Sequence, residues 1–480
     1  MKNQNANLFI MIKLKEIIVQ LDDRTYEDFK EQLSKNKADN FLYLAQSYRQ
    51  NNVDDEEIIH HLNLNSNSFY VLKSRLYDKI RNHISSGVDV NRDDIFKQLQ
   101  QVHEMIYNQP REIAIAFLQK LEEDLLKFDM HGELLMVYNA LKKVHLKSDR
   151  FFHYSQLYNK HVAFWLSLEK AESVLGNFNQ ILGLYDCSKS PEYIDKLLFL
   201  RTEILNHLAL NPSRQIELIK NIIELQLAIF CDTKPDADLD PEEVLNDTLK
   251  KLKELPESSN HKKWGIAIDF LYFEYYRKIN SPKALQQCLK VNEQIGNFML
   301  YNSICLSPRF LPSKAQVMGE AGKINEMLSD ADKQILIDPN DSYSKVLYGL
   351  YSSLLSYYGG RTKEGINTLN SIINLYSFKD FFHINIEVKL TLAYYYLQIK
   401  EFDLAENLLK NIYRKIKSEE LNHYDNVLDI IKVLNMELYP DKSEKGGSKK
   451  KDSFTLFVAR NTGKYAVLSH LMPELKKKFN

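Results

Sequence analysis

The strongest constraint on the fold lies between Ile386 and Tyr413, where small and large apolar residues are spaced as in two packed helices. Ala393 and Ala405 lie twelve residues apart, and bulky side chains flank both of them. Helix backbones approach closely only where a side chain is small, so this spacing indicates a close crossing. The sequence therefore predicts a helical hairpin. A lone hairpin leaves its second apolar face uncovered, so we expect further hairpins to pack beside it.

Three weaker copies of this pattern precede the clearest one. Ala315 takes the first small position in one copy, and Ser353 and Gly365 take both small positions in the next. The copy nearest the N-terminus has Ala284 at the second small position but a bulky Tyr272 at the first. A tyrosine at that position should push its two helices apart. Equivalent positions recur at steps of 43, 38 and 40 residues.

The hairpins resemble the tetratricopeptide repeat (TPR), a 34-residue helical pair with small residues on both helices. The longer steps predict longer helices or loops than the family standard. The resemblance implies an all-α, right-handed α-solenoid that binds a protein or peptide in its concave face. In the family the first helix of each hairpin lines that face, which points to Phe273, Tyr276, Arg277, Gln316, Tyr357, Tyr394 and Gln398 as partner contacts. Such side chains suit an extended peptide, but packing is the alternative role for each.

Composition shifts divide the chain into four parts. Residues 1–90 are expected to form a small helical N-terminal domain, and residues 91–440 the repeat array, clearest over 264–415. Residues 441–453 have no apolar side chain and predict a flexible linker. Residues 454–480 begin with a short apolar run that suggests a strand, and continue as an amphipathic helix with a basic end. This tail either caps the last hairpin or reaches a partner as a tethered peptide.

A competing signal lies at residues 54–84. A short helix with an acidic start precedes a turn at 63–65, and a second amphipathic helix follows. This layout resembles the helix-turn-helix of sigma-factor region 4 and related regulators, whose second helix reads DNA. That resemblance implies nucleic-acid contacts from Ser66, Asn67, Ser68, Tyr70, Lys73, Arg75 and Lys79. Acidic and basic side chains are nearly equal in number over residues 1–90, however, so the pair also fits the plain start of a solenoid.

Composition and motifs exclude several classes of function. A net charge of −1 argues against a surface that binds nucleic acid or anionic membrane throughout. The four cysteines are far apart and form no CxxC or Cys/His pair, so neither a metal site nor a disulfide framework is predicted. No stretch approaches the ~20 apolar residues that cross a bilayer. Nucleophile-elbow, HExxH and Walker motifs are also missing from the sequence.

These observations lead to one main hypothesis and two alternatives. The main hypothesis is a non-enzymatic, cytoplasmic adaptor without a cofactor, which binds a protein or peptide partner. The first alternative is a transcriptional regulator whose helix-turn-helix binds DNA or polymerase and whose repeats sense a protein or peptide. The second is a helical enzyme with a site built from dispersed residues. The sequence specifies neither the partner nor the oligomeric state.

Overall fold

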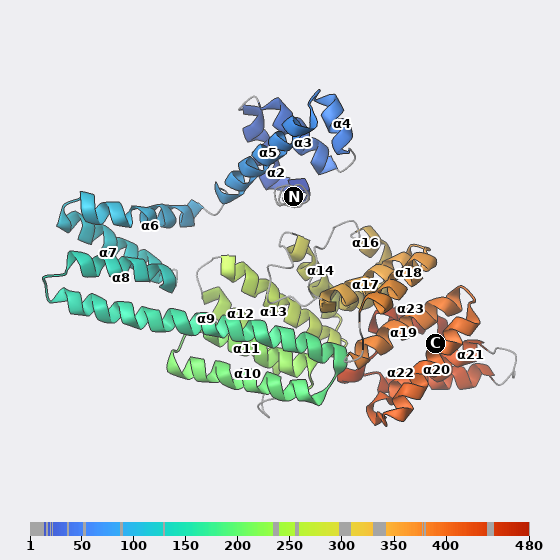
Figure 1. Cartoon of the computed structure of the whole chain (residues 1–480). Coiled ribbons are helices and arrows are strands. Elements are labelled where there is room, and N and C mark those ends of the chain that lie inside the picture. The colour runs from blue at the N-terminus through green and yellow to red at the C-terminus, as the bar shows by residue number, and fades with distance from the viewer. Residues whose placement is uncertain are drawn as a thin grey trace. The chain divides into compact units, whose positions relative to one another are not determined.

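The computed structural model describes most of the chain, and every regular element in its described residues is a helix (Figure 1). The described residues are 14–15, 18–19, 21, 23–35, 38–50, 54–86, 90–127, 130–233, 240–254, 259–296, 309–329, 342–376, 378, 381–438 and 446–479. The all-α fold class is therefore confirmed for these residues. The chain forms two compact units, which we describe separately. The first comprises residues 1–125 and 136–151, and the second residues 126–135 and 152–480.

The first unit begins with four short helices around one small core. They are α2 (Asp23–Lys35), α3 (Asp39–Gln50), α4 (Asp55–His61) and α5 (Ser66–Ser86). The apolar stripe of α5 buries Phe69, Leu76 and Ile80 against α2 and α3. The helices α6 (Val90–Asn108), α7 (Arg111–Lys127) and α8 (His131–Val144) follow. Arg111, at the start of α7, donates from Nε to the Val144 carbonyl at 2.8 Å and so fixes the end of α8.

The second unit contains the longest helix, α9 (Arg150–Ser188), followed by a series of shorter ones (Figure 1). The series is α10 (Pro191–Leu210), α11 (Arg214–Phe230), α12 (Pro241–Glu254), α13 (Ser259–Lys278), α14 (Lys283–Gly296), α15 (Phe310–Glu320), α16 (Ile324–Ser329), α17 (Ser342–Tyr358), α18 (Thr362–Leu375), α19 (Phe382–Gln398), α20 (Phe402–Ser418), α21 (Asp425–Leu438), α22 (Gly446–Arg460) and α23 (Met472–Phe479). Three-residue 3-10 turns occur at η3 (Asn422–Tyr424), η5 (Gly463–Tyr465) and η6 (Ser469–Leu471).

Helices of the second unit pack as successive hairpins. α13 packs along α14, α17 along α18, α19 along α20 and α21 along α22. First helices also contact one another, as α13 does α15 and α15 does α17. The predicted close crossings are present: a Cβ on Gly365 would lie 2.8 Å from the Ser353 carbonyl oxygen, and Ala393 and Ala405 are fully buried. Small residues therefore set the spacing within these hairpins, as the sequence indicated.

Tyr272 does not separate its helices as the sequence suggested. Its hydroxyl donates to Asn246 Oδ1 of α12 at 2.7 Å, and the ring is buried. Because the side chain points toward the preceding helix, Ala284 of α14 still packs tightly against α13. The expectation was wrong because the sequence pattern did not show which neighbour this position faces.

The C-terminal part also differs from expectation. Helix α22 begins at Gly446, so residues 446–453 are helical rather than a flexible linker. The apolar run continues this helix and is not a strand, and it buries Phe454 and Phe457 in the interface with α21. Three residues separate these two rings, which places them on one helical face. Residues 441–445, and residues 87–89 at the expected edge of the N-terminal domain, lie outside the described residues.

Candidate partner-binding face

The residues predicted to contact a partner divide into three groups in the structure. Phe273 forms the first group by itself. It is fully buried, and its ring centroid lies 5.5 Å from that of Phe310. Its predicted contact with a partner is therefore wrong, since α15 covers that face of α13. The prediction placed Phe273 by family position alone, which cannot account for an aromatic side chain that fills the gap between neighbouring hairpins.

A second group joins α13 to α15 through polar contacts. Arg277 donates to Glu274 Oε2 at 2.8 Å from Nη2 and to Gln316 Oε1 at 2.9 Å from Nη1. Glu274 is fully buried, so the guanidinium neutralises a carboxylate that water does not reach. Tyr276 is half-buried, and the Lys283 ammonium lies 5.2 Å from its ring centroid. The hydrogen bond between Arg277 and Gln316 therefore brings two of the predicted residues together, one from α13 and one from α15.

The third group joins α17 to α19. The rings of Tyr357 and Tyr394 meet edge to face with centroids 5.9 Å apart, and their hydroxyl oxygens are 3.4 Å apart. Burial raises the pKa of both phenols, and the Glu474 carboxylate raises it further. Gln398 is half-buried, and its Nε2 has no hydrogen-bond partner among the described residues. Tyr394 is only 2% exposed, so something covers this part of the surface.

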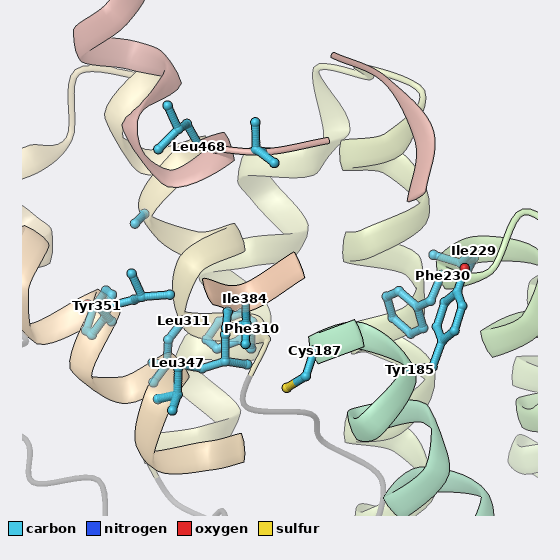
Figure 2. Close-up of a cluster of buried hydrophobic side chains, with 14 of the residues drawn as sticks. Tyr185, Cys187, Ile229, Phe230, Phe310, Leu311, Leu347, Tyr351, Ile384 and Leu468 are labelled. Atoms are coloured by element: carbon cyan, nitrogen blue, oxygen red, sulfur yellow. The ribbon is translucent and has the colours of Figure 1, made fainter. Parts of the chain in front are cut away.

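The covering element is the chain's own C-terminal segment, residues 461–479. Its backbone is held by two carboxylates that are distant in the sequence. The Lys464 N–H donates to Asp232 Oδ2 at 2.9 Å, just after α11. The Leu468 N–H donates to both oxygens of Glu387 on α19, each at 2.9 Å. Figure 2 shows Leu468 on this segment, where it crosses the helices of the second unit.

Apolar side chains anchor the same segment. Val467, Leu468, Leu471 and Leu475 are fully buried, and each such burial contributes roughly 1.5–3 kcal/mol. Pro473 rests on Gly319 of α15 so closely that a Cβ there would lie 2.7 Å from the proline Cγ. The segment also contacts α17 through η6. These contacts hold it on the first helices of three successive hairpins.

Charge is complementary across this contact. We call the acceptor surface the tail-binding face and define it by Asp232, Gly319, Glu320, Glu387, Thr391 and Glu437. Lys476 pairs with Glu320 at 3.0 Å, and Lys478 pairs with Glu437 at 2.9 Å. The His470 Nε2 lies 3.1 Å from the Thr391 hydroxyl. The segment contains four lysines and one glutamate, so a basic peptide lies on a carboxylate-bearing face. Two of these carboxylates also pair with lysines outside the segment, Asp232 with Lys278 and Glu437 with Lys450.

A buried charge cluster joins the end of α9 to α15 and α17. Asp186, near the end of α9, accepts hydrogen bonds from Arg309 at 2.6 Å, Lys189 at 2.8 Å and Tyr343 at 2.9 Å. Although burial opposes its ionisation, the Arg309 and Lys189 charges hold the pKa of Asp186 at about 2. The neighbouring Cys231 has its pKa raised to about 12 by burial, so its thiol stays protonated. Figure 2 shows Cys187, at the end of α9, beside Phe310 of α15 and Leu347 of α17.

In the N-terminal unit, both helices predicted between residues 54 and 84 are present, as α4 and α5. Lys73, however, is 5% exposed and donates to Asp55 Oδ2 at 2.8 Å, so its predicted presentation to nucleic acid is wrong. It follows Phe69 by one helical turn and therefore shares the buried stripe. The remaining predicted contacts are exposed, namely Ser66, Asn67, Ser68, Tyr70, Arg75 and Lys79.

The described residues contain no group of three or more His, Cys, Asp or Glu side chains placed to hold a metal ion. Cys305 lies outside them. Within the described ranges, none of the helices is long and apolar enough to span a bilayer. No protein-family model and no curated protein sequence matches the chain.

Sequence reasoning missed the tail-binding face because its parts are far apart in the chain. Leu468 and Glu387 are separated by 81 positions, and Lys464 and Asp232 by 232. The apolar residues of the segment carried the only usable signal. Their number was too large for a solvated tail, since Val467, Leu468 and Leu471 all require cover.

Proposed function

We propose that the chain is a non-enzymatic scaffold, a right-handed solenoid of TPR-like hairpins that binds a protein or peptide partner in the cytoplasm. The observation that carries this proposal is the hold on the C-terminal segment. Asp232 and Glu387 accept backbone N–H groups of a segment that has no α-helix between Asn461 and Leu471. Backbone hydrogen bonds with pockets for selected side chains are a general means of peptide recognition.

The stacking of hairpins supports the same function. First helices α15, α17 and α19 together present one surface, and the residues of the tail-binding face come from several hairpins. A surface assembled from repeats can hold a long ligand through many separate contacts. Arg277 and Gln316 extend the polar part of this surface toward α13.

The test is capture from native lysate followed by cross-linking and mass spectrometry, with the full chain as bait. The proposal expects a protein partner that survives nuclease treatment and cross-links to lysines of the second unit, such as Lys464 and Lys476. A bait with Lys79→Arg is the control, because that change removes a lysine that could be cross-linked on α5 but keeps the charge of the helix. Capture that disappears after nuclease treatment, with cross-links confined to α5, would refute the proposal.

A second candidate function is transcriptional regulation through α4 and α5. The favouring observation is the exposed polar start of α5, where Asn65 caps the helix by accepting the Ser68 N–H at 2.8 Å. This leaves Ser66, Asn67 and Tyr70 on the surface. A salt-dependent mobility shift with duplex DNA, weakened by Arg75→Ala, is expected under this candidate. The same mobility with and without Arg75 would count against it.

A further inference from the structure

We infer that the tail-binding face is a site for basic, leucine-bearing peptides, and that residues 461–479 are the resident ligand that such a peptide must displace. This inference rests on the proposed function, because it names the class of partner. The argument has three steps: the charge of the face, the way it holds its ligand, and the consequence of the tether.

The charge of the face selects a cationic ligand. Glu320 and Glu437 each pair with a lysine of the segment, and both lysines retain partial exposure. Glu387 is 12% exposed and receives Leu468 N–H with both oxygens. A carboxylate as well covered as Glu387 disfavours an acidic peptide, because like charges in a shielded site repel strongly.

Side-chain pockets select leucine at defined positions. Leu468 and Leu471 lie three residues apart and are fully buried, and Leu475 follows four residues later, also fully buried. Pro473 fits against Gly319, where even a Cβ on the glycine would collide with the ring. The recognised pattern is therefore a leucine pair, a proline and a final leucine, followed by lysines.

The segment is held almost wholly by these tertiary contacts. Between Asn461 and Leu471 its regular structure is two three-residue 3-10 turns, and the Asn461 side chain closes the loop by two hydrogen bonds with the backbone of Val467. Leu468 has φ of 58°, in the left-handed region that a leucine rarely occupies. The longest helix in the segment is the eight-residue α23, so the segment can leave the face without unfolding any of the longer helices.

The covalent link to α22 determines how readily a free peptide competes. A tether of this kind gives the segment an effective concentration in the millimolar range. A peptide that makes the same contacts should therefore bind the unmodified chain only near millimolar concentration. Substitutions that weaken binding of the resident segment, but leave the face intact, should therefore raise the affinity of the chain for a free peptide.

The experiment measures fluorescence anisotropy of a labelled peptide spanning residues 462–480, titrated with full-length protein. The chain carrying Leu468→Ala and Leu471→Ala is expected to bind the peptide at least tenfold more tightly than the unmodified chain. Leu456→Ala is the matched control, because Leu456 lies on α22 with 40% exposure and outside the face. That variant should bind as the unmodified chain does.

Two further changes test the stated chemistry. Adding Glu387→Gln to the double variant should weaken the peptide by on the order of tenfold, because a charged acceptor is lost. A peptide with serine in place of both Leu468 and Leu471 should not bind. Equal affinity of the folded double variant and the unmodified chain for the peptide would overturn the inference. The segment would then be a fixed part of the core that no peptide displaces.

Should the double variant fail to fold, the unmodified chain still decides the question. Hydrogen exchange within residues 462–479 should quicken when millimolar peptide is added, and unchanged exchange would overturn the inference. The proposed function fails separately. If lysate capture succeeds but the peptide neither binds nor competes, only this inference is wrong. If the peptide binds but no protein is captured, the proposed scaffold function is wrong.

Discussion

Replacing Gly365 by alanine should destabilise the second unit, although alanine is the better helix former. Gly365 lies on α18, and a Cβ there would approach the Ser353 carbonyl oxygen of α17 to 2.8 Å. The Tyr395 ring lies 3.4 Å from the same position. A backbone oxygen cannot rotate away as a side chain can, so the two helices must separate.

The magnitude follows from two opposing contributions. Alanine gains about 1 kcal/mol over glycine in a helix interior. Inserting a methyl group into a packed contact costs about 1–3 kcal/mol, and a contact with backbone belongs near the upper end. The expected net change is a loss of about 1–2 kcal/mol in the free energy of unfolding.

Gly176 provides a matched control, because it lies within α9 and a Cβ there has nothing within 4 Å. Gly176→Ala should raise the free energy of unfolding by up to about 1 kcal/mol. Urea unfolding followed by far-ultraviolet circular dichroism measures both variants. If Gly365→Ala is as stabilising as Gly176→Ala, the close crossing of α17 and α18 is wrong.

Three further predictions concern buried charge. Asp186→Asn should lower the free energy of unfolding by about 3–5 kcal/mol, because the buried Lys189 ammonium loses its carboxylate; a urea midpoint close to that of the unmodified chain would contradict this. Burial lowers the pKa of His161 from 6.5 to about 4. The unfolded chain therefore binds a proton more readily as pH falls from 6.5 to 4, and stability should fall by about 1–2 kcal/mol over that range, a slope that His161→Gln should reduce. Asp55→Ala should cost the N-terminal unit about 1.5–3 kcal/mol by leaving the Lys73 ammonium buried and unpaired, and thermal unfolding that matches the unmodified chain would contradict it.

The hairpins were predictable because they depend on local spacing. Ser353 with Gly365, and Ala393 with Ala405, mark contacts between helices that follow one another in the chain. The burial of Lys73 could also have been predicted from the sequence, since Lys73 follows Phe69 by four residues on the buried stripe. Its charge suggested exposure, but a carboxylate partner at Asp55 compensates for its burial.

The site was less predictable because it depends on long-range contacts. No local pattern connects Glu387 with Leu468, or Glu320 with Lys476. The absence of apolar side chains over residues 441–453 suggested a flexible linker, but residues 446–453 begin a helix whose Phe454 and Phe457 are buried. The prediction of a linker from composition failed there, because a helix needs only one buried apolar face to be stable and its remaining residues can all be polar.

The central claim is that the tail-binding face is where the chain holds its partner. The most direct test compares lysate capture by three full-length baits: the unmodified chain, the chain with Leu468→Ala and Leu471→Ala, and that double variant with Glu387→Gln added. Quantitative mass spectrometry of one nuclease-resistant partner provides the readout. We predict more capture by the double variant than by the unmodified chain, and a loss of that gain when Glu387 is neutralised. Equal capture by all three folded baits would contradict the claim.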